Sequence, residues 1–293
     1  MVKVDEFQSL FRAAEREPFR FEPPPLGRVV LVIDDQSGDP EPLWQMTARF
    51  LPALATAEWS AISVDSLETV ADVVDEIAGR GVDLIVTVRH VGEAASLGPG
   101  AMKQSTGGVP RHSLGVYLDV LTQAAAQPVL VLPGTSWSIE SVDRPARSTV
   151  VVTDHIRGES RLIGSAAALS PPGSRLWLCH VEDEAVFERY LAAIAQIPEL
   201  DTDLARTRIA ETLLDEAREY LTAAKAGLEA AGRDWQVIPQ VSVGHPLTEF
   251  KRLVESHTVD LVVMNTKDDD QLAMHGTAYA IAVELVDTPL LLL

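Results

Sequence analysis

The apolar runs of this chain fall into pairs, with one member of each pair in each half. Every run is short enough to be a buried strand. The pairs are VLVID at 30–34 with VVVTD at 150–154, VDLIV at 82–86 with VDLVV at 259–263, and PVLVL at 128–132 with PLLLL at 289–293. Because the pairs keep the same order in both halves, the pattern predicts an internal duplication.

The spacing of the paired runs predicts how the two copies differ. Asp34 and Asp83 are 49 residues apart, whereas Asp154 and Asp260 are 106 residues apart. A crossover between parallel strands needs a dozen or more residues, so the second copy has room for one more strand–helix unit and additional helix. The first copy is therefore expected to lack one such unit.

Strands and helices are expected to alternate along both copies. The first copy contains strands at 29–33, 60–64, 82–88 and 128–132, with helices after Pro42, at 67–79 and at 113–125. The second contains strands at 149–153, 175–181, 236–243, 259–264 and 289–293, with helices at 159–169, within 184–231, at 246–256 and at 276–286. Such alternation is typical of parallel sheets. The predicted fold is α/β, with two tandem doubly wound domains of Rossmann-like type.

The same pattern divides the chain into an extension and two domains. Residues 1–27 carry Phe7, Leu10 and Phe11 at helical spacing, followed by a proline-rich run. We place the truncated first domain at 28–134 and the complete second domain at 148–293. Because the first domain lacks a unit, we expect it to expose a sheet edge or apolar surface that the extension covers.

Composition and charge narrow the class of protein. The 293 residues are 46% hydrophobic, enough for two cores, and no apolar run approaches the length of a membrane span. A formal charge of −19 disfavours nucleic acid as a partner. The single cysteine, Cys179, lies in a predicted strand and is expected to be a core residue. We expect a cytoplasmic protein that contacts neither nucleic acid nor membrane.

The second domain resembles the universal stress protein family along nearly its whole length. The resemblance rests on residues in a fixed order: Asp154, His180-Val181, Gly244-His245-Pro246, Asp260 with its apolar run, Gly276-Thr277 and Pro289 with the final leucines. The first domain resembles the same family more weakly, through its strands and the spacing of its aspartates. The resemblance implies that the last strands of the two domains pair, which makes the chain a pseudo-dimer. A homodimer of whole chains stays open.

The resemblance also directs attention to the loop after the fourth strand of the second domain. In the ATP-binding branch of the family this loop resembles Gly-x-x-Gly-x9-Gly-Ser/Thr, whose glycines let backbone N–H groups approach phosphate. Here the leading glycine positions hold Asn265 and Asp268, and only Gly276-Thr277 remains. Asp268, Asp269 and Asp270 would also repel a triphosphate. A metal site with His275 is the alternative to a solvated acidic loop, and we favour the solvated loop.

Two further positions have open interpretations. Asp154 aligns with the family position that contacts adenine, but an aspartate there also suits a turn cap, and the residues favour neither role. Asp34 is its counterpart in the first domain. The long loop before the third predicted helix of that domain holds Lys103, Arg111 and Ser113 beside glycines, which suits an anion, although plain flexibility is the favoured interpretation.

Two functions therefore remain. The first is a non-enzymatic stress-response or regulatory protein with degenerate ATP-binding loops, which acts through protein contacts or a small ligand. The alternative is an adenine-nucleotide switch or slow ATPase, since an adenine nucleotide is the one cofactor that the resemblance suggests. In the first domain the leading glycine positions of the family loop hold Val88 and Val91. The glycine pattern is thus broken in both halves, which favours the first function, and no motif of a hydrolase or a phosphate-binding loop is present.

Overall fold

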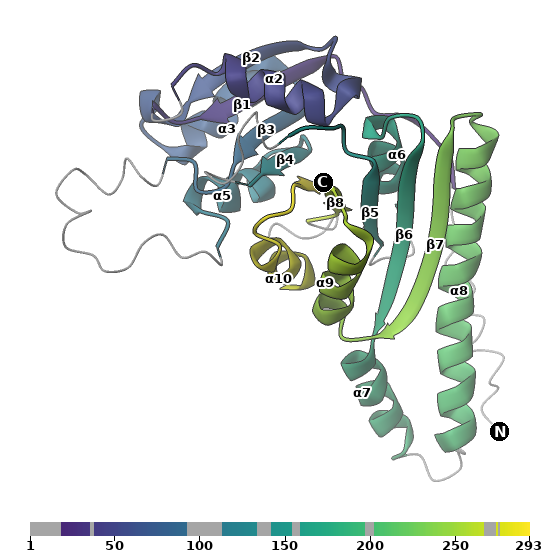
Figure 1. Ribbon diagram of the computed structural model, residues 1–293. Helices are drawn as coiled ribbons and strands as arrows, with labels where there is room; N and C mark the ends of the chain where they lie inside the picture. The colour runs from purple at the N-terminus through teal and green to yellow at the C-terminus, as the bar shows by residue number, and fades with distance from the viewer. Residues whose placement is uncertain are drawn as a thin grey trace.

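The computed structural model describes residues 19–35, 38–92, 113–133, 142–153, 159–196, 202–266, 274 and 276–293, except for the side chains of 202–205. In these ranges the strands form one sheet in the order β2-β1-β3-β4-β9-β8-β5-β6-β7 (Figure 1). The first half contributes β1 (Arg28–Ile33), β2 (Glu58–Ser63), β3 (Leu84–Val88) and β4 (Val129–Leu132). The second half contributes β5 (Ser148–Thr153), β6 (Ser174–Asp183), β7 (Trp235–Gly244), β8 (Leu261–Met264) and β9 (Leu290–Leu292).

Helices cover both faces of this sheet, which confirms the predicted α/β class. One face carries α2 (Glu41–Phe50), α6 (Glu159–Leu169) and α8 (Thr202–Ala230) over a shared apolar core, and the short η2 (Pro52–Leu54) lies beside α6. The other face carries α3 (Val70–Arg80), α5 (Val116–Ala124), α9 (Pro246–His257) and α10 (Gly276–Glu284). Helix α7 (Glu184–Ile194) and the first part of α8 project beyond the sheet in Figure 1. No described helix is both long and apolar enough to cross a membrane.

The strand order shows the predicted duplication and the missing unit. Reading outward from the centre, the second half has β9, β8, β5, β6 and β7, while the first half has only β4, β3, β1 and β2. All neighbours are parallel except β4 and β9, which pair antiparallel with Val129 opposite Leu292 and Val131 opposite Leu290. The predicted pairing of the two final strands is confirmed, and the unit absent from the first half is the outermost one.

The two halves also repeat individual hydrogen bonds. The Oδ2 atom of Asp83 accepts two consecutive backbone N–H groups at the start of β1, both at 2.9 Å. The Oδ2 atom of Asp260 accepts the equivalent pair at the start of β5, at 2.8 and 2.9 Å. The aspartate of the VDLIV and VDLVV runs therefore has the same structural role in both halves. It holds the start of β1 beside β3 in the first half and the start of β5 beside β8 in the second.

Some predicted boundaries were wrong because local backbone geometry overrides periodicity. Helix α3 was expected from residue 67 but begins at Val70, because Thr69 and Asp72 form a reciprocal capping box. Helix α5 was expected from residue 113 but begins at Val116, because Gly115 has a φ of 98° that no helix accommodates. The helical spacing of apolar residues within 202–230 predicts one buried stripe on the longest helix, and the structure confirms it: Ala217, Tyr220, Leu221, Ala224 and Leu228 are buried, and Leu213 is half-buried.

The described start of the extension, at Phe19 and Phe21, contacts the second half. The stripe of Phe7, Leu10 and Phe11 is outside the described residues. Within the described part, Phe19 lies against Gly227 of α8, and the ring of Phe21 meets the ring of Trp235 edge-on at 5.7 Å. The expectation that this stripe covers the truncated half therefore stays a prediction, while Phe19 and Phe21 make their apolar contacts with α8 and β7.

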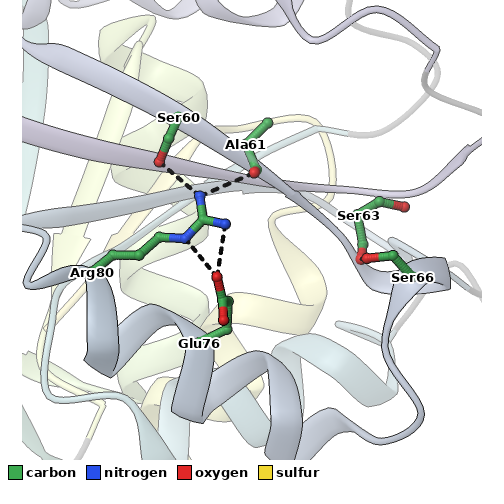
Figure 2. Close-up of polar contacts among 6 residues, drawn as sticks. All are labelled: Ser60, Ala61, Ser63, Ser66, Glu76 and Arg80. Carbon is green, nitrogen blue, oxygen red and sulfur yellow. Dashed lines mark hydrogen bonds and ion pairs between the residues drawn. The ribbon is translucent and has the colours of Figure 1, made fainter.

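Polar groups instead occupy the open edge of the first half. The N–H of Glu58 donates to the Gly27 carbonyl, so the backbone N–H and C=O groups of the even-numbered residues of β2 point toward β1. Those of the odd-numbered residues point toward the open edge. At that edge the Nη1 atom of Arg80 donates to the Ala61 carbonyl at 3.1 Å, and the Ser66 hydroxyl donates to the Ser63 carbonyl at 2.6 Å (Figure 2). A guanidinium and a hydroxyl thus bind carbonyls that a further strand would otherwise reach.

Candidate functional site

The strand order predicts where a ligand would bind in each half. In open α/β sheets, ligands bind beyond the carboxyl ends of the strands at the point where the strand order reverses. That point lies between β1 and β3 in the first half and between β5 and β8 in the second. The loops that follow these four strands therefore frame the two candidate sites.

In the first half, the chain's own groups occupy this point. Asp34 follows β1 and is 8% exposed, and its Oδ2 atom accepts the N–H of Gly92 at 3.0 Å in a buried hydrogen bond. Gly92 belongs to the turn after β3, so the bond joins the two loops that would have to part around a ligand. Asp34 thus acts as a structural acceptor in this conformation.

Gly92 is also tightly packed. Its φ is 76°, and a Cβ atom added to it would lie 2.6 Å from the Tyr117 ring and 3.0 Å from the Val64 side chain. The neighbouring Val91 is 1% exposed and belongs to the core under α3 and α5. Val91 stands at one of the positions where the family loop would have a leading glycine, and here its side chain draws the turn into the core.

A second polar cluster fixes the loop after β1. The N–H of Asp35 donates to the Asp65 carboxylate at 2.7 Å, and the Ser63 hydroxyl donates to the Asp35 carboxylate at 2.7 Å. Two carboxylates are therefore anchored across the ends of β1 and β2. Ser113 is half-buried just before α5, while Lys103 and Arg111 lie outside the described residues. The predicted anion-binding cluster of these three side chains therefore stays a prediction.

In the second half, the described groups near the crevice are mostly engaged in structure. Nδ1 of His180 donates to the Thr153 carbonyl at the end of β5 at 2.8 Å, and its Nε2 is 3.5 Å from Glu182. Asn265 follows β8 and is half-buried. The next residue, Thr266, is 2% exposed, and its hydroxyl donates to the Leu293 carbonyl at 2.7 Å. These side chains therefore satisfy backbone carbonyls at the ends of β5 and β9 from within the chain.

The start of α10 is the accessible part of this second crevice. Gly276 is exposed, and a Cβ atom added to it would meet no atom within 4 Å. Thr277 is half-buried beside it. The first backbone N–H groups of a helix are without intrahelical partners, so this end of α10 is where an anion would be accommodated. Asp154 and Asp268 to Asp270 lie outside the described residues, as does His275.

Sequence reasoning missed a buried arginine at the junction of the halves. Arg89 follows β3, is 5% exposed, and donates from Nη2 to the carbonyls of Ala282 at 2.6 Å and Leu285 at 2.9 Å. A cation is favourable there because these carbonyls close the carboxyl end of α10. Burial lowers the pKa of Arg89 to about 10, and the nearby Asp287 opposes that shift. The Nε and Nη1 atoms have no hydrogen-bond partner in the described structure.

Thr266 is the counterpart of Arg89 in the second half. Their backbone N–H groups donate to Leu293 at 2.8 Å and to Leu132 at 3.0 Å, respectively, which are equivalent residues of the two halves. The Thr266 hydroxyl also lies 3.4 Å from the carbonyl of Thr122 in α5, so each residue reaches the last helix of the other half. The only signal in the sequence was a polar residue one or two positions after a buried strand.

Other polar features of the described chain do not form a site. A hollow of about 470 Å³ beside α3 is lined by Glu68, Asp72, Asp75 and Glu76, but Asp72 caps α3 and Glu76 binds Arg80. A second hollow, of about 220 Å³, lies at the amino ends of β8 and β9. No three His, Cys, Asp or Glu side chains of the described residues gather as metal ligands. Burial raises the pKa of the Cys179 thiol to about 12, which disfavours the reactive thiolate.

Comparisons with known proteins find likeness in structure but none in sequence. No family model and no curated protein sequence matches the chain. A putative universal stress protein from Pseudomonas aeruginosa is 12% identical, with a TM-score of 0.48 over 91% of this chain and 92% of that chain. A universal stress protein from Archaeoglobus fulgidus is 13% identical, with a TM-score of 0.45 over 88% of this chain and 77% of that one. The universal stress protein UspA from Lactobacillus plantarum is 12% identical, with a TM-score of 0.32 over 50% of this chain and 98% of that chain.

Proposed function

We propose that this chain is a non-enzymatic regulatory protein of the universal stress type that acts through protein contacts or a small ligand. The observation that carries the proposal is the closed crevice of the first half. There Asp34 binds the Gly92 N–H at 3.0 Å, and Tyr117 and Val64 leave no room above Gly92. A nucleotide would have to break this buried bond, and a buried group left without its partner costs about 1–3 kcal/mol.

The locations of the described groups with shifted pKa values also support binding over catalysis. Catalysis requires positioned acids, bases or nucleophiles with suitable pKa values. The described groups with strongly shifted pKa values are Arg89, Cys179 and Tyr220, and burial is the main cause in each case. Arg89 and Cys179 lie in the junction and the core, respectively, where they serve structure.

An adenine-nucleotide switch or slow ATPase is the second candidate. Its specific support is the accessible start of α10, where Gly276 is exposed and unobstructed. The sequence of the preceding loop opposes it, because Asn265 and Asp268 replace the leading glycines and Asp268 begins three consecutive aspartates. Homodimerisation and a cytoplasmic location stay predictions alongside both candidates.

Calorimetric titration with ATP and Mg²⁺ at moderate salt separates the two candidates. We expect no binding at micromolar concentrations, because several backbone and charge-assisted hydrogen bonds of about 0.5–3 kcal/mol each are missing. Micromolar binding by the unmodified chain would overturn the proposal. As a matched gain-of-function control, Asn265→Gly and Asp268→Gly, combined with neutral residues at 269 and 270 and two inserted loop residues, should increase the affinity.

A further inference from the structure

The turn that follows β3, residues 89–92, is held at several points of the first half. The N–H of Arg89 donates to the last carbonyl of β4 at 3.0 Å, and the N–H of His90 donates to a carbonyl just before α5 at 3.2 Å. The N–H of Gly92 donates to the Asp34 carboxylate at 3.0 Å. One turn of the chain therefore contacts the end of β4, the segment before α5 and the loop after β1.

The backbone of this turn is strained. His90 has a φ of 61°, in the left-handed region that residues other than glycine rarely adopt. Among the described residues, Thr258 is the one other non-glycine residue with a positive φ. Such a conformation is unfavourable and persists only where surrounding contacts impose it, and strain of this kind gathers at segments that switch between conformations. The turn is therefore expected to relax when one of its contacts is lost.

The side chain of Arg89 extends the turn into the second half. It is 5% exposed, and its Nη2 atom donates to two carbonyls at the carboxyl end of α10, at 2.6 and 2.9 Å. The last carbonyls of a helix have no partner within the helix, so Arg89 caps α10 from the other half. The reverse contact is weaker, since the Thr266 hydroxyl lies 3.4 Å from the Thr122 carbonyl and also donates to Leu293 at 2.7 Å.

Arg89 is only partly satisfied in this position. Its Nε and Nη1 atoms have no hydrogen-bond partner in the described structure, although a buried charge is stable only when it is well paired. The exposed carboxylate of Asp287 lies close enough to act on the charge of the guanidinium. Arg89 therefore has a second partner within reach, outside the cap on α10. A side chain with two alternative partners is an element that can take two arrangements.

We propose that the turn 89–92 couples the two crevices: when the bond between Asp34 and Gly92 opens, the turn relaxes, its arginine leaves α10, and α10 loosens. The accessible part of the second crevice is the start of this same helix, at Gly276, and α10 has only nine residues. Packed elements change between discrete arrangements, so a change at one end of so short a helix reaches the other end. The inference goes beyond the proposed function, because it concerns the protein without any ligand.

Coupling between two sites acts in both directions. A ligand that orders the start of α10 favours the capped arrangement and keeps the first crevice closed, whereas a ligand that opens the first crevice loosens α10. A ligand that binds both arrangements equally well changes neither crevice. The closed crevice of the first half is then a control point for the second half instead of a lost site.

The first test is hydrogen–deuterium exchange of the full chain, with mass spectrometry of the peptides that cover α10. Asp34→Ala should raise exchange in α10 at least about fivefold, because it removes the acceptor of the Gly92 N–H. In an Arg89→Met background the same change should add less than about twofold. Asp83→Ala is the matched control, since it also removes an acceptor of backbone N–H groups, but at the amino end of β1. Equal exchange in wild type and Asp34→Ala, an equal rise with Asp83→Ala, or an undiminished rise in the Arg89→Met background would overturn the proposal.

A second measurement applies even if Asp34→Ala does not fold. His90→Gly removes the strain of the positive φ and so favours the closed turn, which should slow exchange in α10 at least about threefold. Thr258→Gly is the matched control, because it relieves the other described positive φ, of 48°, at the end of α9. An unchanged rate with His90→Gly, or an equal decrease with Thr258→Gly, would contradict the coupling. Neither measurement uses ATP, so a failure here is distinguishable from a failure of the proposed function.

Discussion

The two halves build the same contact from different side chains. The last residue of α3, Arg80, reaches β2, where Nη1 donates to the Ser60 hydroxyl at 3.0 Å and to the Ala61 carbonyl at 3.1 Å. At the equivalent place, the last residue of α9 is His257, whose ring stacks on Trp177 of β6 with centroids 3.8 Å apart. A helix end meets its strand in both cases, but the first contact is polar and the second is aromatic.

The difference follows from what lies beyond the strand. β6 pairs along its whole length with β7, so its outer carbonyls already have partners. β2 is the outermost strand of its half, so a cation that binds its edge carbonyls blocks pairing with another chain. At the other outer edge, β7 carries Pro239, a residue that sheets confine to edge strands. Each edge of the sheet is therefore protected by local chemistry.

The largest effect is expected where the first-half crevice is closed. Gly92→Ala forces a side chain onto a residue with a φ of 76° and places its Cβ atom 2.6 Å from the Tyr117 ring. We expect a loss of about 3 kcal/mol in the free energy of unfolding, from backbone strain and overpacking together. Urea denaturation measures it. A loss below about 0.5 kcal/mol would mean that the crevice is loose enough to admit a ligand, as the nucleotide alternative requires.

The next effect compares the shared aspartates. Asp83→Ala and Asp260→Ala each remove an acceptor from two backbone N–H groups, so we expect a loss of about 2 kcal/mol for each. Asp260→Ala should cost about 0.5 kcal/mol more, because Arg144 also binds Asp260, at 2.8 Å, in a partly exposed ion pair. Arg144→Ala is the control and should account for that excess. The same urea unfolding experiment applies, and an Asp83 variant as stable as wild type would contradict the equivalence of the two residues.

At the β2 edge we expect a smaller loss in the free energy of unfolding together with a change in self-association. Arg80→Ala should cost about 1 kcal/mol and produce concentration-dependent association, because the Ala61 carbonyl becomes free to pair. His257→Ala is the matched control at the equivalent position. It should cost a similar amount through the lost ring contact but should not change the state of association, since β6 is already paired. Light scattering after size exclusion compares them, and equal association in both variants would refute edge protection by Arg80.

Much of this fold could be predicted because its signals are local. Short apolar runs fix the strands, and the repeated aspartate in VDLIV and VDLVV fixes the correspondence between the halves. The missing unit followed from counting residues between these runs. Helix starts were less predictable, because capping by Thr69 and the positive φ of Gly115 act within a single turn.

The contacts between distant segments could not be predicted from the sequence. Arg89 binds the Ala282 carbonyl across 193 positions, and Arg20 meets Ser160 across 140. No periodicity encodes such pairings, because each depends on how the two halves lie against one another. The broken glycine pattern was visible in the sequence, whereas the closure of the first-half crevice by Asp34 and Gly92 depended on the position of a loop.

The smallest effect is expected at Gly276, which begins the last helix of the second half, in comparison with Gly115, which precedes the last helix of the first half. Gly115 precedes α5 with a φ of 98°, a conformation that a side chain rarely adopts, so Gly115→Ala should cost about 1–2 kcal/mol. Gly276 begins α10 without a positive φ, and an added Cβ atom meets nothing within 4 Å, so Gly276→Ala should change stability by less than about 0.5 kcal/mol. Thermal unfolding of the two variants compares these positions.

Since Gly276→Ala leaves the fold intact, it also examines the start of α10 as an anion site: if the chain binds phosphate or ATP there, the added methyl group should weaken binding without lowering the melting temperature. A large loss of stability in Gly276→Ala would show that this glycine is needed for folding. Gly276-Thr277, the remaining part of the family loop, would then be explained by folding instead of by nucleotide binding.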